Sequence, residues 1–391
     1  MYLTREQERM LNGEYGWIYA KALKLIVKVG EALGAEKLVK IRHAHVSGVS
    51  FSNIGYPGLE FIRDFYVEGA EARIYTTVNP TCIDVLMQST LISREYADKQ
   101  LEINRFLEGM DFKPTYTCIP YLYRRPFTGE HLAWGESSAV IVSNSIFGAR
   151  TNREGGPIAL AAALTGYTYF AGLHLDENRV VNVVIAPSIR DGAYGALGLW
   201  IGYNIKEIPM IRGLKTSLYE YKLLLAAAAA SGDHALIVLD GITPRDSYTG
   251  CDSCERISVT QRDLEDIKGS PPSEGDEVLG YIGCPHLDPT EFVDLYNLIV
   301  RRASKGFKRG RKLLLTIPPL VAKMYFEEIN ILRKIGVDVA AGTCPIVSKL
   351  TSAFDYIVTD SGKAAFYMSR RHGIKTYVSS TTDVLNEVFR D

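Results

Sequence analysis

One repeated unit limits the fold of this chain more than any other feature of its sequence: an unbroken apolar run, then a turn and, in most cases, a helical segment. It occurs in ALIVLDGITP, EVLGYIGCPHLDPTEFVDLYNLI, KLLLTIPPLVAKMY, VDVAAGTCPIV and DYIVTDSGKAAFYM, which begin at residues 235, 277, 312, 337 and 355. We expect strands also in KLVKIRHAHVSG, ARIYTTVNP and AVIVSNSIF, from residues 37, 72 and 139. Strands that are apolar throughout are typical of parallel sheets covered by helices on both faces. The sequence therefore predicts an α/β fold of mostly parallel sheets.

Helices are predicted from capping signals and from apolar periodicity. A capping box over residues 4–7 opens a short helix, an amphipathic helix is expected over residues 16–33, and another is expected from PTCIDVLMQ onward. The apolar stretches 158–173 and 223–230 are too interrupted or too short to span a membrane. Both are expected to be buried helices, and no membrane role is expected.

Size and charge exclude several classes of protein. The chain has 391 residues, enough for about two to three domains, and the polar stretch 242–276 is the best candidate for a boundary between subdomains. With 47% hydrophobic residues and a net charge of −1, it is too apolar to be disordered and too neutral for nucleic acid to be an expected partner. The first residues, MYLTREQERML, lack the pattern of a secretory signal, and we expect a cytoplasmic protein.

Three of the six cysteines share a context. Cys118 lies in TCIPY, Cys284 in GCPH and Cys344 in GTCPI, so each sits in a turn flanked by proline, and the last two follow apolar strands. Ligand sites collect at the carboxyl ends of parallel strands, and Cys-Pro is a recurrent partner of iron–sulfur ligation. Three thiolates on separate loops could hold three corners of a cubane cluster and leave one iron open. The alternative is that all three are buried thiols near strand ends.

The other three cysteines carry weaker signals. Cys251 and Cys254 form a Cys-x-x-Cys motif, but their loop offers no second pair of Cys or His to complete a zinc site. We interpret them as an adventitious or loop-stapling pair. Cys82, expected early in a helix, is interpreted as a core residue or a wall of the site.

Four turns carry backbone amides, hydroxyls or cations suited to an anionic substrate. They are Gly48-Val49-Ser50, Asn79-Pro80-Thr81, Ser361-Gly362-Lys363, and Arg150 with Asn152 and Arg153. Each of these alone is ordinary turn chemistry. Convergence of the four would make a site.

Glu136 and the two serines after it form a further polar group. A carboxylate beside the hydroxyls of Ser137 and Ser138 could do acid–base work or bind a substrate hydroxyl. The segment is similar to the Gly-x-Ser-x-Gly elbow of serine hydrolases, but it lacks the last glycine and is expected to precede a strand rather than follow one, so a hydrolase is not expected. His43 and His45 fall on one face of a strand and could reach the same site, with a structural role as the alternative.

Nucleotide-binding motifs are not found in the sequence. The glycines at 192, 195, 198 and 202 do not have the Gly-x-Gly-x-x-Gly spacing of a dinucleotide site and suit a small helix face for close packing. No Gly-x-x-x-x-Gly-Lys-Ser/Thr loop is present, which disfavours a P-loop nucleotide hydrolase.

Seven segments together resemble the aconitase X family, within the aconitase superfamily. They are AHVSGVSFSNIG, NPTCID, TCIPY, GESSAVIVSNSIFGARTNREGGP, GCPH, GTCPIVS and TDSGKAAFYM. The segments run in order from about residue 43 to about residue 370 and so cover nearly the whole chain. The resemblance implies an aconitase-like arrangement of several α/β subdomains around a central cluster site, with residues 1–391 forming a catalytic large subunit.

The resemblance also implies roles for individual residues. Cys118, Cys284 and Cys344 would ligate an iron–sulfur cluster, a 4Fe-4S cluster with one labile iron that can also occur as 3Fe-4S. Ordinary aconitases take two of their three cysteines from a Cys-x-x-Cys, and that arrangement is not transferred to Cys251 and Cys254. Catalytic roles would fall to Glu136, assisting the departing water, and Ser137. The substrate-binding positions would be Gly48, Val49, Ser50, Asn79, Pro80, Glu136, Ser137 and Lys363.

Within the family, a free-standing chain of this size resembles the archaeal large subunits of the mevalonate pathway of isoprenoid biosynthesis. This implies a hydro-lyase that dehydrates (R)-5-phosphomevalonate to trans-anhydromevalonate 5-phosphate. Fused bacterial members carry an additional swivelling domain, to which nothing in these 391 residues corresponds. A separate small subunit is therefore expected as the partner in a heterodimer, and the resemblance suggests that a serine of that subunit is the base.

Two alternatives stay open at this point. The first is the same fold and cluster acting on hydroxyproline. The second, from another class, is a cluster-free binding or scaffold subunit whose cysteines are merely buried. The sequence also leaves open which of Arg150, Arg153 and Lys363 meets a phosphate.

Overall fold

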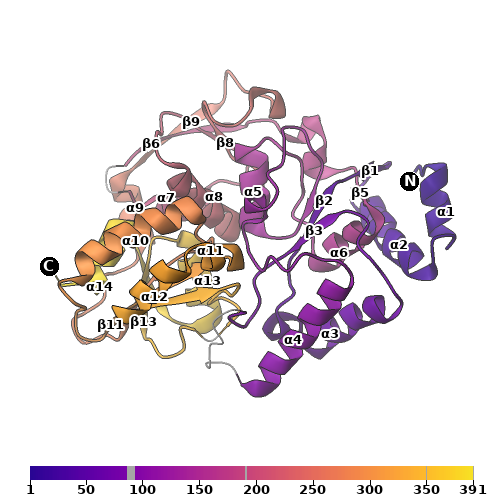
Figure 1. Cartoon of the computed structure of the whole chain (residues 1–391). Coiled ribbons are helices and arrows are strands. Elements are labelled where there is room, and N and C mark those ends of the chain that lie inside the picture. Colours follow the sequence, from indigo (N-terminus) through magenta and orange to yellow (C-terminus); the bar gives the residue numbers. More distant parts are fainter. Residues whose placement is uncertain (86–92, 190–191, 349, 391) are drawn as a thin grey trace.

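Parallel strands dominate the structure. The computed structural model describes residues 1–85, 93–189, 192–348 and 350–390. Among these residues, three sheets are parallel throughout, and a fourth is an antiparallel pair of β1 (Leu38–Lys40) with β5 (Tyr167–Tyr169). The predicted α/β class is confirmed, and Figure 1 shows the helices packed around and between the sheets.

The first parallel sheet belongs to the N-terminal part of the chain and has the order β3-β2-β4. Its strands are β2 (His43–Val46), β3 (Tyr75–Val78) and β4 (Ala133–Trp134). Its helices are α1 (Arg5–Leu11), α2 (Trp17–Ala32), α3 (Phe51–Val67), α4 (Arg94–Gly109), the short η1 (Pro120–Leu122), α5 (Ser137–Ile146) and α6 (Gly156–Thr165). The strands end just before Gly48, Asn79 and Glu136. Because the carboxyl ends of parallel strands meet at one edge, these three turns lie together.

The second sheet has the order β8-β7-β6-β9. Its strands are β6 (Val183–Ser188), β7 (Pro209–Ile211), β8 (Val238–Leu239) and β9 (Glu255–Thr260). Its helices are η2 (Gly172–His174), η3 (Asp176–Asn178), α7 (Tyr194–Asn204), α8 (Leu218–Gly232), η4 (Arg245–Ser247) and α9 (Gln261–Lys268). The polar stretch 242–276 thus contains β9, which pairs with β6, and the helix after it.

The third sheet, in the C-terminal part, has the order β12-β11-β10-β13-β14. Its strands are β10 (Val278–Ile282), β11 (Arg311–Ile317), β12 (Val337–Ala341), β13 (Tyr356–Thr359) and β14 (Lys375–Val378). Its helices are α10 (Pro289–Ala303), α11 (Pro319–Met324), α12 (Phe326–Lys334), α13 (Gly362–Tyr367), the π-helical turn η5 (Met368–His372) and α14 (Thr381–Val388). The ends of β10, β12 and β13 lead directly to Cys284, Cys344 and Lys363.

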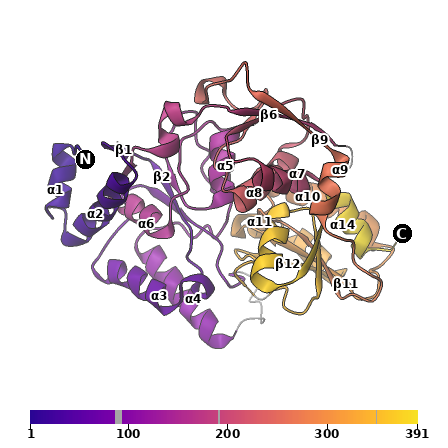
Figure 2. The same ribbon diagram turned by 180° about the vertical axis from the view of Figure 1, so that it is seen from behind.

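Helix α8 joins the three parts, because it packs against α5, α7 and α13. Figure 2 shows α7 and α8 near the middle of the molecule. The glycines of α7 make the close approach possible: a Cβ added at Gly198 would lie 2.2 Å from the carbonyl oxygen of Leu224. The predicted small helix face is therefore confirmed. No helix among the described residues is long and apolar enough to cross a membrane.

The strand expected from Ala139 is wrong, because these residues form α5. Every residue from Ser137 to Ser145 is buried, and an apolar run buried on all sides does not reveal whether it is strand or helix. Glu136 consequently caps a helix that follows strand β4. The order of strand, turn and helix is therefore the one found in the serine-hydrolase elbow, contrary to the expectation from the sequence. Ala139 still stands where that elbow needs glycine.

Two expected helices also differ from the structure. Residues 81–85, expected to begin a helix and to carry Cys82 within it, are not helical, and the remainder of PTCIDVLMQ at 86–88 lies outside the described residues. The helix expected over 158–173 ends at Thr165, because Gly166 adopts the left-handed conformation (φ 77°) and the next three residues form β5.

Glu154, just before α6, is a buried carboxyl group. Its oxygens accept hydrogen bonds from Tyr169 Oη at 2.8 Å and from Thr168 Oγ1 at 3.2 Å. Burial outweighs these bonds and raises the pKa of Glu154 to about 7, from an ordinary value of 4.5. Because the folded-state pKa lies above the unfolded-state pKa, stability that is fully present below about pH 4.5 is lost as the pH rises through about 7.

Glu154→Gln is therefore expected to be more stable than the wild type at pH 8, by on the order of 1–3 kcal/mol, and to differ little at pH 4.5. Thermal melts at the two pH values measure this difference. The control is Glu177→Gln, since Glu177 is exposed. Equal behaviour of the two variants at pH 8 would show that Glu154 ionises without penalty.

Candidate active site

The strand ends of the first and third sheets meet at a cavity of about 240 Å³. Nine of the predicted site residues line it. They are Gly48, Asn79, Pro80, Cys118, Glu136, Ser137, Cys284, Cys344 and Lys363. Residues from the N-terminal and C-terminal sheets thus come together, because most of them follow a parallel strand or open a helix at this edge.

Three cysteines in the cavity wall have free thiols. Burial raises the pKa of Cys118 to about 12, and it raises the pKa values of Cys284 and Cys344 above the ordinary thiol range. The Glu136 carboxylate, and after it a neighbouring thiolate, raise the pKa of Cys118 further, and neighbouring thiolates raise the pKa of Cys344. At neutral pH these thiols keep their protons unless a metal displaces them.

The donor set fits a cluster better than a single metal ion. Among the described residues, no three His, Cys, Asp or Glu side chains are arranged to hold one metal ion. In a cubane cluster each cysteine binds its own iron, so the three sulfur atoms need to surround a cavity rather than meet at a point. Cys118, Cys284 and Cys344 do surround one.

His286 ties together the three turns that carry these cysteines. Its backbone N–H donates to Cys118 Sγ at 3.2 Å, and its Nδ1 lies 3.2 Å from Thr117 Oγ1. Its Nε2 lies 2.8 Å from the carbonyl oxygen of Thr343. Each threonine directly precedes a cysteine of the site, so the imidazole sets the spacing between the loops. The segment GCPH contained this histidine, but its role depends on contacts that the sequence does not show.

Glu136 and Lys363 form a largely buried ion pair in the cavity wall. The Glu136 carboxylate also accepts hydrogen bonds from Asn79 Nδ2 at 2.9 Å and from the N–H of Ser138 at 3.3 Å. Lys363 Nζ donates to Ser137 Oγ at 3.1 Å and to Ser138 Oγ at 3.3 Å. The pair therefore joins the start of α5 to the start of α13.

Both members of this pair stay charged. Burial alone would raise the pKa of Glu136, but the Lys363 ammonium and the hydrogen bonds hold it well below its usual range. Burial would likewise lower the pKa of Lys363, and the Glu136 carboxylate outweighs this and raises it. Glu136 is thus a hydrogen-bond acceptor and Lys363 a hydrogen-bond donor.

Two predicted substrate positions lie beside the cavity lining rather than in it. Val49 is buried, and its carbonyl oxygen accepts a hydrogen bond from Gln100 Nε2 at 3.0 Å. Ser50 is the N-cap residue of α3, with Oγ 2.9 Å from Ser52 Oγ. Their roles in substrate binding stay predictions.

Other candidates point elsewhere. Arg150 pairs with Asp176, and Asn152 binds the backbone at Ala171 and Leu173, so neither lines the cavity. The remaining cysteines are also absent from its wall, with Cys82 buried against Gln100, and Cys251 and Cys254 joined as a disulfide. Of the arginine turn, only Arg153 reaches the lining, and it pairs with Asp233.

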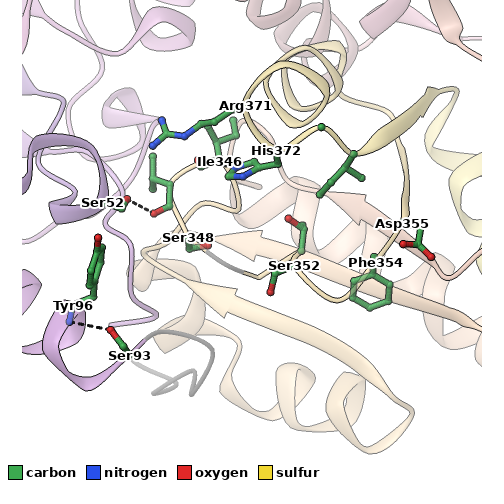
Figure 3. Close-up of a pocket in the computed structure, with 14 residues that line it drawn as sticks. Ser52, Ser93, Tyr96, Ile346, Ser348, Ser352, Phe354, Asp355, Arg371 and His372 are labelled. Atoms are coloured by element: carbon green, nitrogen blue, oxygen red, sulfur yellow. Dashed lines mark hydrogen bonds between the residues drawn. The ribbon is translucent and has the colours of Figure 1, made fainter.

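Arg371 is the cavity-lining cation that sequence reasoning missed. It lies on the π-helical turn after α13, and its guanidinium donates to Asn53 Oδ1 at 2.6 Å. It also lines a second cavity of about 660 Å³, as do Ile346 and Val347. Figure 3 shows that second cavity, with Arg371 and Ser52 among the residues that line it. Ser52 Oγ donates a hydrogen bond to the carbonyl oxygen of Val347 at 2.5 Å. The sequence signal for Arg371 was its position eight residues after Lys363, which was a predicted site residue.

Known proteins resemble this chain along nearly its whole length. Family models described as the aconitase X first, second and third domains match residues 1–177, 178–269 and 278–390. The phosphomevalonate dehydratase large subunit of Thermococcus kodakarensis is 36% identical over 396 residues, covering 99% of this chain and 100% of that protein. The protein of the same name from Methanosarcina mazei is 35% identical and covers 99% of this chain and 97% of its own length.

Two further comparisons bear on fold and substrate. A cis-3-hydroxy-L-proline dehydratase of Pseudomonas aeruginosa is 29% identical, covering 74% of this chain but only 52% of that protein. The crystal structure of Thermococcus kodakaraensis aconitase X in its holo-form matches with a TM-score of 0.90 and 36% identity, over 99% of this chain and 100% of that one. The chain belongs to the aconitase X family.

Proposed function

We propose that this chain is the catalytic large subunit of an iron–sulfur dehydratase that converts (R)-5-phosphomevalonate to trans-anhydromevalonate 5-phosphate. The observation that carries the proposal is the meeting of three free cysteines and the Glu136–Lys363 ion pair in one cavity. Relatives named phosphomevalonate dehydratase large subunits match over nearly their full length, whereas the hydroxyproline dehydratases extend well beyond the matched part.

The reaction removes a tertiary hydroxyl group and a proton from the neighbouring carbon, and it yields a carbon–carbon double bond and water. Hydroxide is a poor leaving group, so the reaction needs an electrophile at the leaving oxygen and a base at the neighbouring carbon. A 4Fe-4S cluster held by Cys118, Cys284 and Cys344 would supply a Lewis-acidic iron for that oxygen.

The ion pair and its neighbours would hold and orient the substrate. An ionised Glu136 accepts a hydrogen bond from the substrate hydroxyl and so fixes its direction. Lys363 Nζ and Ser137 Oγ are donors that can bind the substrate carboxylate or stabilise the departing water. The backbone at Gly48 lets a ligand approach closely, since a Cβ there would meet nothing within 4 Å and the φ of 69° suits glycine.

The base is proposed to come from a small swivel-domain subunit. Glu136 is the only carboxylate among the described residues of the cavity wall, and no histidine belongs to that wall. Because Lys363 and Asn79 hold Glu136 as a low-pKa acceptor, it is a weak base. The relatives are named large subunits, which fits a partner that completes the site.

Arg371 is proposed to bind the phosphate. Of the three basic side chains in the cavity wall, Lys363 pairs with Glu136 and Arg153 pairs with Asp233. Within the described part of the chain, Arg371 contacts the neutral amide of Asn53 and no carboxylate. It is therefore the lining cation whose charge is free to meet a phosphate.

Arg371→Gln is expected to raise the KM for 5-phosphomevalonate by about 10- to 100-fold, because it removes one charge-assisted hydrogen bond to the substrate phosphate. The change in kcat should be small. Steady-state kinetics of the reconstituted complex measure both constants. Arg153→Gln serves as the matched control and should change KM less. A larger effect of the Arg153 substitution would assign the phosphate to that side of the cavity.

The substrate itself is tested by supplying 5-phosphomevalonate and cis-3-hydroxy-L-proline in parallel to the anaerobically reconstituted complex with its small subunit. We expect an unsaturated phosphorylated acid from the first and no product from the second, with the large subunit alone inactive. If the complex converts hydroxyproline but not 5-phosphomevalonate, the chain carries out the hydroxyproline dehydratase reaction instead. A colourless protein without iron and sulfide, inactive on both, would favour a binding or scaffold role.

A further inference from the structure

A chain of hydrogen bonds runs from the Glu136 carboxylate into the core of the N-terminal sheet. Asn79 Nδ2 donates to Glu136 Oε2 at 2.9 Å, and Asn79 Oδ1 lies 3.2 Å from His45 Nε2. His45 Nδ1 lies 2.8 Å from Thr77 Oγ1, which lies 2.9 Å from His43 Nε2. His43, His45 and Thr77 are fully buried. The chain follows from the sheet itself, because His43 and His45 face one side of β2, and His45 is the register partner of Thr77 on β3.

The ion pair fixes the direction of this chain. An ionised Glu136 is only an acceptor, so the amide nitrogen of Asn79 must face it. The amide oxygen of Asn79 then faces His45. Since that oxygen is also only an acceptor, His45 Nε2 must carry the proton.

The remaining directions follow one by one. Burial lowers the pKa of His45 to about 4, so at neutral pH the ring is uncharged and its Nδ1 is bare. Thr77 therefore donates a hydrogen bond from its hydroxyl group to His45 Nδ1. The alternative acceptor for this hydroxyl group, the carbonyl oxygen of Ala44, is farther away at 3.5 Å. Thr77 then accepts from His43 Nε2. His43 Nδ1 has no hydrogen-bond partner, as suits a bare nitrogen where the chain of bonds ends.

We infer that His45 is a positioning residue for the reaction, which fixes the Asn79 amide so that its N–H bond, and not its oxygen, faces Glu136. The inference rests on the proposed function for its kinetic consequence. Without the His45 N–H, the amide of Asn79 can rotate and bring its oxygen against the Glu136 carboxylate, where two acceptors repel. The substrate hydroxyl would then meet a misplaced carboxylate.

The kinetic test compares His45→Phe, which keeps a ring but has no donor, with His45→Gln, which keeps an N–H. In the reconstituted complex, His45→Phe is expected to lower kcat by about 10- to 100-fold with a small change in KM and unchanged iron content, and His45→Gln to recover most of kcat. His234→Phe is the control, since His234 is another buried histidine whose Nε2 meets a carbonyl oxygen, that of Ile205, away from the cavity. Wild-type kcat in His45→Phe, or equal loss in both His45 variants, would overturn the inference.

A second measurement does not depend on activity. Nitrogen-15 NMR of histidine-labelled protein distinguishes protonated from bare ring nitrogens, and His45→Gln assigns the His45 signals by their loss. We expect a neutral His45 with its proton on Nε2 at pH 7. A proton on Nδ1, or a charged ring, would overturn the inference. If 5-phosphomevalonate is not a substrate, the proposed function fails, whereas the protonation of His45 is still decided by this spectrum.

Discussion

Replacing Cys284 with serine is expected to remove the iron–sulfur cluster and to lower turnover by at least about 1,000-fold, because the Lewis acid supplies several kcal/mol to the departure of the hydroxyl. Cys284 is buried at the end of β10, and serine is close to it in size, so the fold should be kept. The serine hydroxyl does not ionise as a thiol does and is a poor ligand for iron. Iron and sulfide per chain, the visible spectrum and kcat measure the outcome.

The matched control for Cys284→Ser is Cys82→Ser. Cys82 is also a buried free thiol, but it contacts Gln100 and is absent from the cavity wall. It should keep its iron, its sulfide and its activity. Full iron content and activity in Cys284→Ser, or loss of the cluster in Cys82→Ser, would contradict the assignment of the ligands.

Lys363→Met is expected to lower both stability and activity. It leaves the buried Glu136 carboxylate without its counterion, which in comparable buried pairs costs about 3–5 kcal/mol of unfolding free energy. It also removes the donor that faces Ser137 and the cavity. The double variant Glu136→Gln/Lys363→Met should regain most of the stability, because no charge is left unpaired, but it should not regain activity. Denaturant unfolding and steady-state kinetics separate the two effects.

Arg124→Met provides the comparison for Lys363→Met. Arg124 pairs with Glu130, a buried carboxylate that does not line the cavity, so the substitution should cost stability and spare kcat. The account of the ion pair would be wrong if the double variant recovered activity together with stability. It would also be wrong if Lys363→Met lowered stability alone.

The sequence was sufficient to place the residues that directly follow strands. Cys284, Cys344 and Lys363 each come just after an apolar run, and the carboxyl ends of parallel strands share one edge. Asn79 could be placed for the same reason, after β3. Glu136 was expected at the site from the family resemblance, and it lines the cavity although the element after it is a helix and not the expected strand.

What the sequence did not reveal depends on contacts across the fold. α5 was mistaken for a strand, because a short apolar run buried on all sides has no informative periodicity. Arg371 reaches the cavity from the end of a helix, and His286 acts through three loops at once. The direction of the His45 hydrogen bonds follows only once Glu136 and Lys363 are known to pair.

Anomalous diffraction at the iron edge, from crystals of the anaerobically reconstituted protein, tests most directly whether the three cysteines hold the cluster. We expect an iron signal in the cavity bounded by Cys118, Cys284 and Cys344, beside the Glu136–Lys363 ion pair. No iron in that cavity, or iron bound instead at Cys251 and Cys254, would contradict this expectation.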